Sequence, residues 1–237
     1  MGARRKAWRS LKSATRVRLA ALLSRLRSLA GLSNPKVFCV GRNKTGTTSL
    51  AAALKELGYR VGRQRDAEML MEDWGRRDFR RLIAYCHTAD AFQDVPFSLD
   101  YTFQAVDAAF PGSKFILTVR DSPEQWYRSL TRFHAKRLGK GRIPTPDDLR
   151  NDSYVFKGWL WRNKELVFGP EEDTLFDEAL YKAHYVAHNE RVVDYFRHRP
   201  TDLLVLNLAT PDSMNRLCEF LGRPWTGQQM PTLNRSS

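Results

Sequence analysis

Three short apolar runs stand out along the chain, at residues 36–40, 115–119 and 203–208. Each has the length and composition of a strand that is buried on both faces. Each is followed by a segment in which apolar residues recur at steps of three and four, the spacing that predicts a helix. Strands that alternate with helices predict a parallel sheet covered by helices on both faces, which is a three-layer α/β fold.

The helix after the second run has the clearest start signal in the sequence. Ser122 is suited to the N-cap position, Pro123 to the first helical position, and Gln125 stands three residues after the cap. This arrangement predicts a capping box, in which the serine and glutamine side chains each bond a backbone N–H of the first turn. Trp126, with further apolar residues at helical spacing, would form the buried face of this helix.

The remaining segments are predicted from the same spacing and from stop signals. The helix after the first run should end at Gly58, and the helix after the third run, at about residues 212–221, should end at Gly222. Residues 62–92 and 134–200 are expected to be mostly helical, with a loop at residues 139–146 and a long helix from about residue 175 to residue 197. Within the first of these segments, residues 92–97 are typical of a short strand that leads into a turn.

Positive charge is concentrated at the N-terminus. The formal net charge is +13, yet the first 36 residues contain ten Lys and Arg residues and no acid. Residues 1–34 are therefore interpreted as a basic amphipathic extension, and residues 35–237 as one folded domain. The extension is either solvated or docked on its own domain, or it contacts an anionic membrane surface or an acidic polymer. The folded part is only mildly basic, so no nucleic-acid partner is expected.

Cysteine usage and hydropathy favour a cytoplasmic protein. Cys39, Cys86 and Cys218 are an odd number without close spacing, which suits reduced thiols and gives no metal-ligand pattern. The early apolar run at residues 19–23 is too short for a signal peptide or a spanning helix. We expect a cytoplasmic location, with the extension as a peripheral contact at the inner membrane surface if it binds lipid.

The strongest local signal is the loop at residues 41–49, Gly-Arg-Asn-Lys-Thr-Gly-Thr-Thr-Ser, between the first strand and its helix. Such a loop presents backbone N–H groups and the positive end of a helix to an anion. In ATPases a lysine follows the second glycine and reaches the terminal phosphates. Here Thr47 holds that position and the lysine, Lys44, precedes Gly46 by two residues. ATP hydrolysis is therefore disfavoured.

The segment from Lys44 to Ser49 resembles the 5'-phosphosulfate loop of sulfotransferases that use PAPS (3'-phosphoadenosine 5'-phosphosulfate). The second apolar run, with Arg120 at its end and Ser129 in the next helix, is similar to the 3'-phosphate site of that family. The segments at residues 203–207 and 217–222, with Pro231 and Asn234, resemble the closing segment of bacterial members. The family commonly spaces the arginine and serine by eight residues, but here the spacing is nine, so Ser122 is an alternative to Ser129.

The resemblance implies a P-loop NTPase-like fold and a set of donor ligands. Those residues are Arg42, Lys44, Thr45, Gly46, Thr47, Thr48, Ser49, Arg120 and Ser129. It implies in-line transfer of a sulfuryl group from PAPS to a hydroxyl or amine, with PAP (the 3',5'-bisphosphate) as product. Because a sulfuryl group carries less negative charge than a terminal phosphate, no metal is expected.

Two catalytic residues are predicted. Lys44 would stabilise charge on the bridging oxygen as the bond to sulfur breaks, and Asp94 would accept the acceptor's proton. His134 and His87 are alternatives for the base. Trp159 and Trp161 belong either to the core or to an acceptor pocket.

Two other functions fit parts of the sequence. A P-loop kinase would need a lysine after Gly46 and a magnesium-holding acid, which are missing or unrecognised. A basic membrane- or polyanion-binding protein with a vestigial nucleotide fold would explain the charged extension but not the intact donor motifs. The acceptor, whether carbohydrate, lipid or small molecule, and the oligomeric state stay open.

Overall fold

The computed structural model describes Leu22 and residues 35–233. The predicted amphipathic extension lies outside the described residues except for that one leucine, and so does Asn234. The proposed boundary at residues 34 and 35 therefore stays a prediction.

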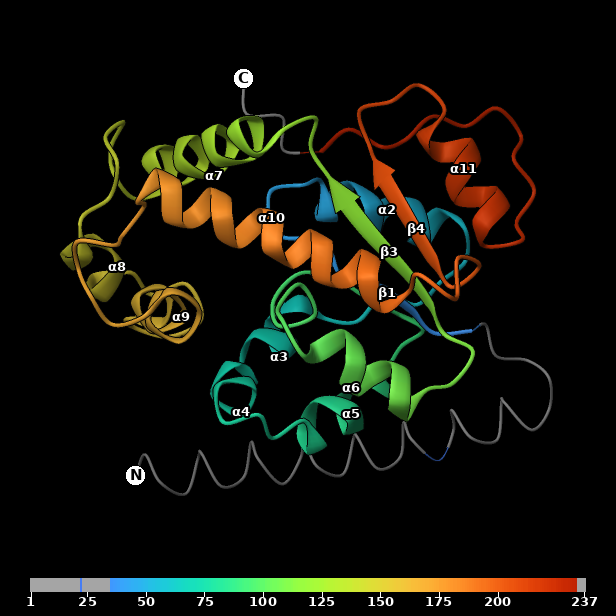
Figure 1. Ribbon diagram of the computed structural model, residues 1–237, viewed down its shortest axis with the longest axis horizontal. Coiled ribbons are helices and arrows are strands. Elements are labelled where there is room, and N and C mark those ends of the chain that lie inside the picture. Colours follow the sequence, from blue (N-terminus) through green and yellow to red (C-terminus); the bar gives the residue numbers. More distant parts are fainter. Residues whose placement is uncertain (1–21, 23–34, 234–237) are drawn as a thin grey trace.

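A four-stranded parallel sheet forms the centre of the molecule (Figure 1). Its strands are β1 (Val37–Cys39), β2 (Ala91–Phe92), β3 (Lys114–Val119) and β4 (Leu203–Asn207). The order across the sheet is β2-β1-β3-β4, and all three pairings are parallel. The three apolar runs of the sequence are β1, β3 and β4, and the strand expected near residue 92 is β2.

Ten further described elements are helices. They are α2 (Thr47–Glu56), α3 (Gln64–Glu68), α4 (Met71–Gly75), α5 (Arg80–Cys86), α6 (Thr102–Ala109), α7 (Pro123–Arg137), α8 (Pro146–Asn151), α9 (Trp159–Phe168), α10 (Glu178–Tyr195) and α11 (Ser213–Phe220). The predicted helices, the loop between α7 and α8 and the long helix α10 are confirmed within a few residues. Helix α6 was not predicted.

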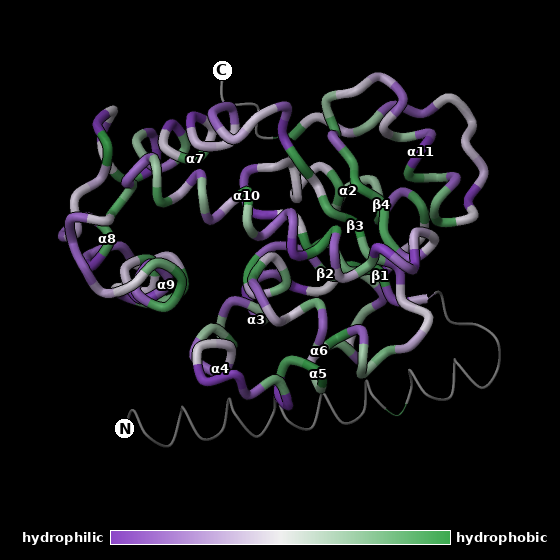
Figure 2. The backbone as a smooth tube through the Cα atoms, in the orientation of Figure 1, coloured by the Kyte–Doolittle hydropathy of each residue, from purple (hydrophilic) through white to green (hydrophobic). Residues whose placement is uncertain are grey.

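Side chains alternate between the two faces of the sheet along each strand, so one core cluster lies on each face. Phe38 and Phe115 face one side of the sheet, where they pack with residues of α5, α6 and α10. Cys39 and Ile116 face the other side, where α2 and α11 cover them. Both faces are therefore buried, which agrees with the hydrophobic colour of the strands in Figure 2, and the predicted three-layer α/β architecture is confirmed.

The start of α7 corrects one detail of the sequence prediction. Ser122 is the N-cap, and its Oγ accepts a hydrogen bond from the N–H of Gln125 at 3.2 Å, with Pro123 at the first position. The Gln125 side chain, however, accepts from the N–H of Asp121 at 3.0 Å and donates to the Asp121 carboxylate at 2.6 Å. The predicted bond from the Gln125 side chain to the backbone N–H of Ser122 was therefore wrong, because Gln125 bonds both the backbone and the carboxylate of Asp121 instead.

Candidate active site

The site lies where the strand order reverses. The chain continues from β1 to β2 on one side of the sheet and from β3 to β4 on the other, so the loops after β1 and β3 lead away in opposite directions. The two loops touch through one bond, in which Arg120 Nε donates to the Lys44 carbonyl at 2.9 Å. The two segments that resemble donor-binding motifs are therefore adjacent in space, although 76 residues separate these two in the sequence.

The loop after β1 needs its two glycines. A Cβ on Gly41 would lie 2.1 Å from Thr118 Oγ1, so no side chain fits where β1 approaches β3. Gly46 has a φ of 101°, and Lys44 also lies in the left-handed region with a φ of 68°. Gly46 is the N-cap of α2, and no side chain caps this ten-residue helix. The amides of its first turn thus remain available for an anion.

Several backbone carbonyl groups of the loop after β1 accept hydrogen bonds from side chains. Four of them accept a hydrogen bond from a side chain: Val40 from His188 Nε2 (2.8 Å), Arg42 from Thr45 Oγ1 (2.6 Å), Asn43 from Trp126 Nε1 (2.9 Å) and Lys44 from Arg120 Nε (2.9 Å). These bonds fix the loop in one conformation.

Helix α10 supports the loop after β1, a role that sequence reasoning did not identify. Tyr185 stacks on Trp126 with ring centroids 4.6 Å apart, and its hydroxyl accepts from the N–H of Arg120 at 3.0 Å. One turn away, His188 Nδ1 lies 2.7 Å from the Asp100 carboxylate. Tyr181, His184, Tyr185 and His188 recur at steps of three and four, which is the one signal in the sequence that could have revealed this face.

Arg42 lies between the loop and this helix. Its guanidinium donates to the Ser98 carbonyl at 3.2 Å and to His184 Nδ1 at 2.5 Å, and burial lowers the pKa of Arg42 to about 10. Arg42 also lines the cavity described below. The predicted donor ligand is thus partly engaged by the protein itself.

The four loop hydroxyls have different surroundings. Thr45 is buried, and its hydroxyl lies 2.5 Å from that of Thr118. Ser49 Oγ accepts from the N–H of Leu233 at 3.0 Å. Thr47 donates to Asp94 at 3.3 Å, whereas Thr48 is exposed and lines the cavity. Of the four, Thr48 alone presents its side chain to the cavity.

A cavity of about 280 Å³ opens beside the loop, and both predicted catalytic residues, Lys44 and Asp94, line it. Lys44 Nζ lies 3.3 Å from the centre of the Phe133 ring. Burial lowers the pKa of Lys44, and the neighbouring Asp94 carboxylate opposes that shift. Aromatic side chains from α7, α9 and the segment before each of α9 and α10 make up much of the remaining wall.

Asp94 is half-buried beside Thr47 of the loop, in a constrained conformation. Its φ is 61°, and its Oδ1 accepts from the N–H of Val95 at 2.8 Å. Burial raises the pKa of Asp94, while the bonds from Val95 and Thr47 and the charge of Lys44 oppose the rise. A carboxylate whose pKa is moved toward neutrality, beside a cation in a cavity, is suited to accept a proton.

Of the two histidines proposed as alternative bases, the structure places one in the cavity wall and the other outside it. His134 lines the cavity, and burial lowers its pKa to about 4, so its imidazole is neutral at pH 7. His87 lies at the end of α5, with its ring 5.1 Å from that of Phe110, and is not part of the cavity wall.

The predicted 3'-phosphate residues lie outside the cavity wall. Arg120 follows β3 and is half-buried beside the loop, and Ser129 is half-buried on α7. Ser122, the alternative to Ser129, already uses its oxygen as the N-cap of α7. The tryptophans differ as well: Trp159 lines the cavity, and Trp161 packs in the core beside Trp126.

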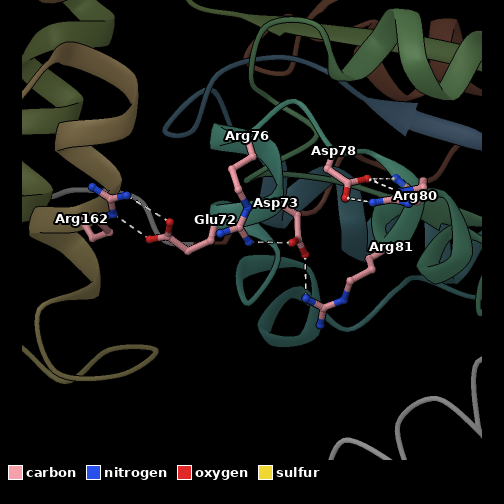
Figure 3. Close-up of polar contacts among 7 residues, drawn as sticks. All are labelled: Glu72, Asp73, Arg76, Asp78, Arg80, Arg81 and Arg162. Atoms are coloured by element: carbon pink, nitrogen blue, oxygen red, sulfur yellow. Dashed lines mark hydrogen bonds and ion pairs between the residues drawn. The ribbon is translucent and has the colours of Figure 1, made fainter.

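Glu68, at the end of α3, was missed by sequence reasoning. It lines the cavity and is 5% exposed, and burial raises its pKa to about 7. Trp159 Nε1 donates to the Glu68 carbonyl at 3.1 Å, and Arg162 of α9 binds Glu72 of α4 with distances of 2.6 and 3.1 Å (Figure 3). Helices α3 and α4 are thus joined to α9 along one wall of the cavity.

The described residues contain neither a metal-binding cluster nor a membrane-spanning helix. Within Leu22 and residues 35–233, no group of three or more His, Cys, Asp or Glu side chains is placed to hold a metal ion. In the same part of the chain, no helix combines the length and the apolar character that crossing a membrane requires.

The central parallel sheet with helices on both faces, and the glycine-containing loop at the reversal of strand order, place the chain in the class of α/β proteins with a P-loop-like fold. Comparison with known families identifies it further. The sequence profile of the family described as "Sulfotransferase domain" matches residues 36–237, and the chain belongs to this family. A comparison with curated proteins gave no match.

Proposed function

We propose that the protein transfers a sulfuryl group from PAPS to a hydroxyl or amine of a small acceptor that enters the aromatic cavity. Membership of the sulfotransferase domain family supports sulfuryl transfer. The observation that carries the choice of donor is the contact between the loop after β1 and Arg120 after β3. A nucleotide with both a 5'- and a 3'-phosphate would engage both segments.

In this proposal the donor's 5'-phosphosulfate lies at the uncapped start of α2. The amides of Gly46, Thr47 and Thr48 and the Thr48 hydroxyl bind its oxygens, and Arg120 binds the 3'-phosphate, with Ser129 as a further ligand. Because the loop carbonyls are already bonded to side chains, donor binding would require little rearrangement.

The chemical step follows from the two charged groups in the cavity. The acceptor oxygen attacks sulfur, the bond from sulfur to the bridging oxygen breaks, and PAP leaves with the electron pair of that bond. Lys44 stabilises the negative charge on the bridging oxygen, and Asp94 takes the acceptor's proton. His134, neutral and also in the cavity wall, is the alternative base.

The test compares the thermal stabilisation by PAP with that by ADP, each with and without magnesium. A ligand that binds the folded state alone stabilises it by RT ln(1 + [L]/Kd), about 2.7 kcal/mol at a hundredfold excess over Kd. We expect a clear shift with PAP, little with ADP, and no dependence on magnesium.

Arg120→Ala should remove most of the difference between PAP and ADP, because charge-assisted bonds to phosphate are among the stronger hydrogen bonds. Arg128→Ala, an exposed arginine on α7, is the matched control and should leave the difference intact. Equal stabilisation by ADP, or a strict magnesium requirement, would falsify the PAPS proposal and favour a kinase.

A further inference from the structure

Glu68 has a buried carboxylate oxygen that the protein does not satisfy. Its Oε1 accepts from the Tyr154 hydroxyl at 2.9 Å and from the Gln64 amide at 3.4 Å. Its Oε2 is buried, and no described residue donates to it. A buried carboxylate oxygen without a donor is costly, and such atoms are rare unless a ligand uses them.

The position of this oxygen links it to the acceptor side of the site. Glu68 lines the cavity together with Asp94, and repulsion from the Asp94 charge contributes to the raised pKa of Glu68. Asp94 in turn acts on the pKa of Lys44. The Glu68 carboxylate therefore belongs to the same cavity as the two proposed catalytic groups, yet the chemical step described above does not use it.

The other walls near Glu68 are mostly aromatic. Tyr154 packs edge-on against Trp159 with ring centroids 5.5 Å apart, and Trp159 bonds the Glu68 backbone. An apolar enclosure with one oriented polar group is the common form of a small-molecule site, in which rings hold the body of the ligand and the polar group sets its orientation. The Tyr154 hydroxyl binds Oε1 and so fixes the orientation of the carboxylate.

We infer that Glu68 Oε2 accepts a hydrogen bond from the acceptor substrate, so that the preferred acceptor is a compact apolar alcohol or amine that carries a second donor group, a hydroxyl or an ammonium. This inference rests on the proposed function. Glu68 is thereby a specificity-determining residue: it binds the end of the acceptor that is not sulfated.

Three matched probes test the inference: trans-1,4-cyclohexanedimethanol, its analogue with one hydroxyl replaced by an amino group, and its analogue with that hydroxyl replaced by hydrogen. All three offer the same primary alcohol to the donor, and they differ only in the second group. Their binding to the PAP-loaded protein is measured by calorimetry and their turnover with PAPS as kcat/KM. The diol and the amino alcohol should exceed the methyl analogue by about tenfold or more, mainly through KM.

Two variants assign the preference to Glu68. Glu68→Gln keeps the shape of the side chain and an oxygen for Tyr154 but replaces the free carboxylate oxygen, and it should reduce the preference to less than about threefold. Glu72→Gln removes a carboxylate from the adjacent helix that binds Arg162 outside the cavity wall, and it should leave the preference unchanged. The two probes with a second donor also distinguish a charged from a neutral partner.

Equal behaviour of the three probes toward the native protein, including failure of all three, overturns the inference, as does a preference that survives in Glu68→Gln. Neither result affects the donor proposal, which the comparison of PAP with ADP tests in the absence of any acceptor. Failure of PAP to stabilise the protein would contradict the proposed function instead.

Discussion

Replacing Glu68 by glutamine should change the pH dependence of stability in a defined direction. The pKa of Glu68 is raised from its ordinary value of 4.5 to about 7, with burial as the largest cause and Asp94 acting in the same direction, while bonds from Tyr154 and Gln64 and the charge of Arg65 oppose it. Between about pH 4.5 and about pH 7, Glu68 thus keeps a proton in the folded state that it has released in the unfolded chain. The native carboxylate destabilises the fold progressively as pH rises from about 4.5 to about 7, and the full cost is present above that range.

The size of this cost follows from the shift. One pKa unit corresponds to about 1.36 kcal/mol, so a shift from 4.5 to about 7 sets an upper limit of about 3 kcal/mol. Solvent at the mouth of the cavity screens part of this interaction, and we therefore expect about 1 to 2 kcal/mol. Glutamine has no charge to bury, so it should avoid the pH-dependent part of the cost.

The assay is urea unfolding of the native protein and of Glu68→Gln at about pH 4.5 and about pH 8, with the linear extrapolation of the free energy of unfolding. For each pH we take the free energy of unfolding of Glu68→Gln minus that of the native protein, and we compare this difference between the two pH values. The unbonded amide of glutamine adds a cost that is equal at both pH values, so that cost cancels in the comparison. The difference should move in favour of the variant by about 1 to 2 kcal/mol at the higher pH.

Glu72→Gln supplies the control with the opposite sign. The bonds from Arg162 lower the pKa of Glu72, so its ionised form stabilises the fold above its ordinary pKa (Figure 3). This pair is partly exposed, and its loss should cost less than about 1 kcal/mol at pH 8. A difference between native protein and Glu68→Gln that does not vary with pH, or that turns against the variant at pH 8, would refute the reasoning about Glu68.

Three predictions concern the chemical step. Lys44→Ala should depress turnover far more than it weakens PAP binding, because the lysine charge matters most as the bond to sulfur breaks; equal losses in single-turnover rate and PAP affinity would reduce Lys44 to a phosphate ligand. Asp94→Asn should lower kcat by roughly 10² or more with little change in PAP affinity, since asparagine tolerates a φ of 61° and can still accept from the N–H of Val95. Because Asp94 must be ionised to accept a proton, turnover of the native protein should rise with pH through its raised pKa. Retained turnover in Asp94→Asn would shift the role to His134.

The loop after β1 and the elements on either side of it could be predicted because their signals are local. The buried run of β1, the two glycines and the helical spacing of Leu50, Leu54 and Leu57 occupy about twenty consecutive residues. Helix α6 was missed because Thr102–Ala109 is short and because its N-cap, Tyr101, supplies no capping side chain that would mark the start of the helix. The φ of 65° at Tyr101 is not visible in a sequence.

Asp94, His134 and Trp159 were candidates from the sequence, but the cavity that they line together with Glu68 could not be predicted, because these residues meet only through tertiary packing. Glu68, Asp94, His134 and Trp159 come from four separate segments, and none has a spacing that relates it to another. The unsatisfied oxygen of Glu68 is a property of the folded cavity, since in the sequence it is an ordinary glutamate on a short helix.

The support of the loop after β1 by α7 and α10 has a consequence for how the proposed donor and the proposed acceptor are recognised. Peptide N–H and C=O groups point in opposite directions, so the bonds to the carbonyls of Asn43 and Lys44 also fix the direction of the N–H groups of Lys44 and Thr45 in the folded protein. The conformational entropy of the loop is then lost during folding and not during binding. Recognition of the proposed donor should therefore be inherited with the sheet and α10, whereas the side chains of α3 and α9 that line the cavity can change without disturbing it. Acceptor choice and donor choice are in this way separately evolvable.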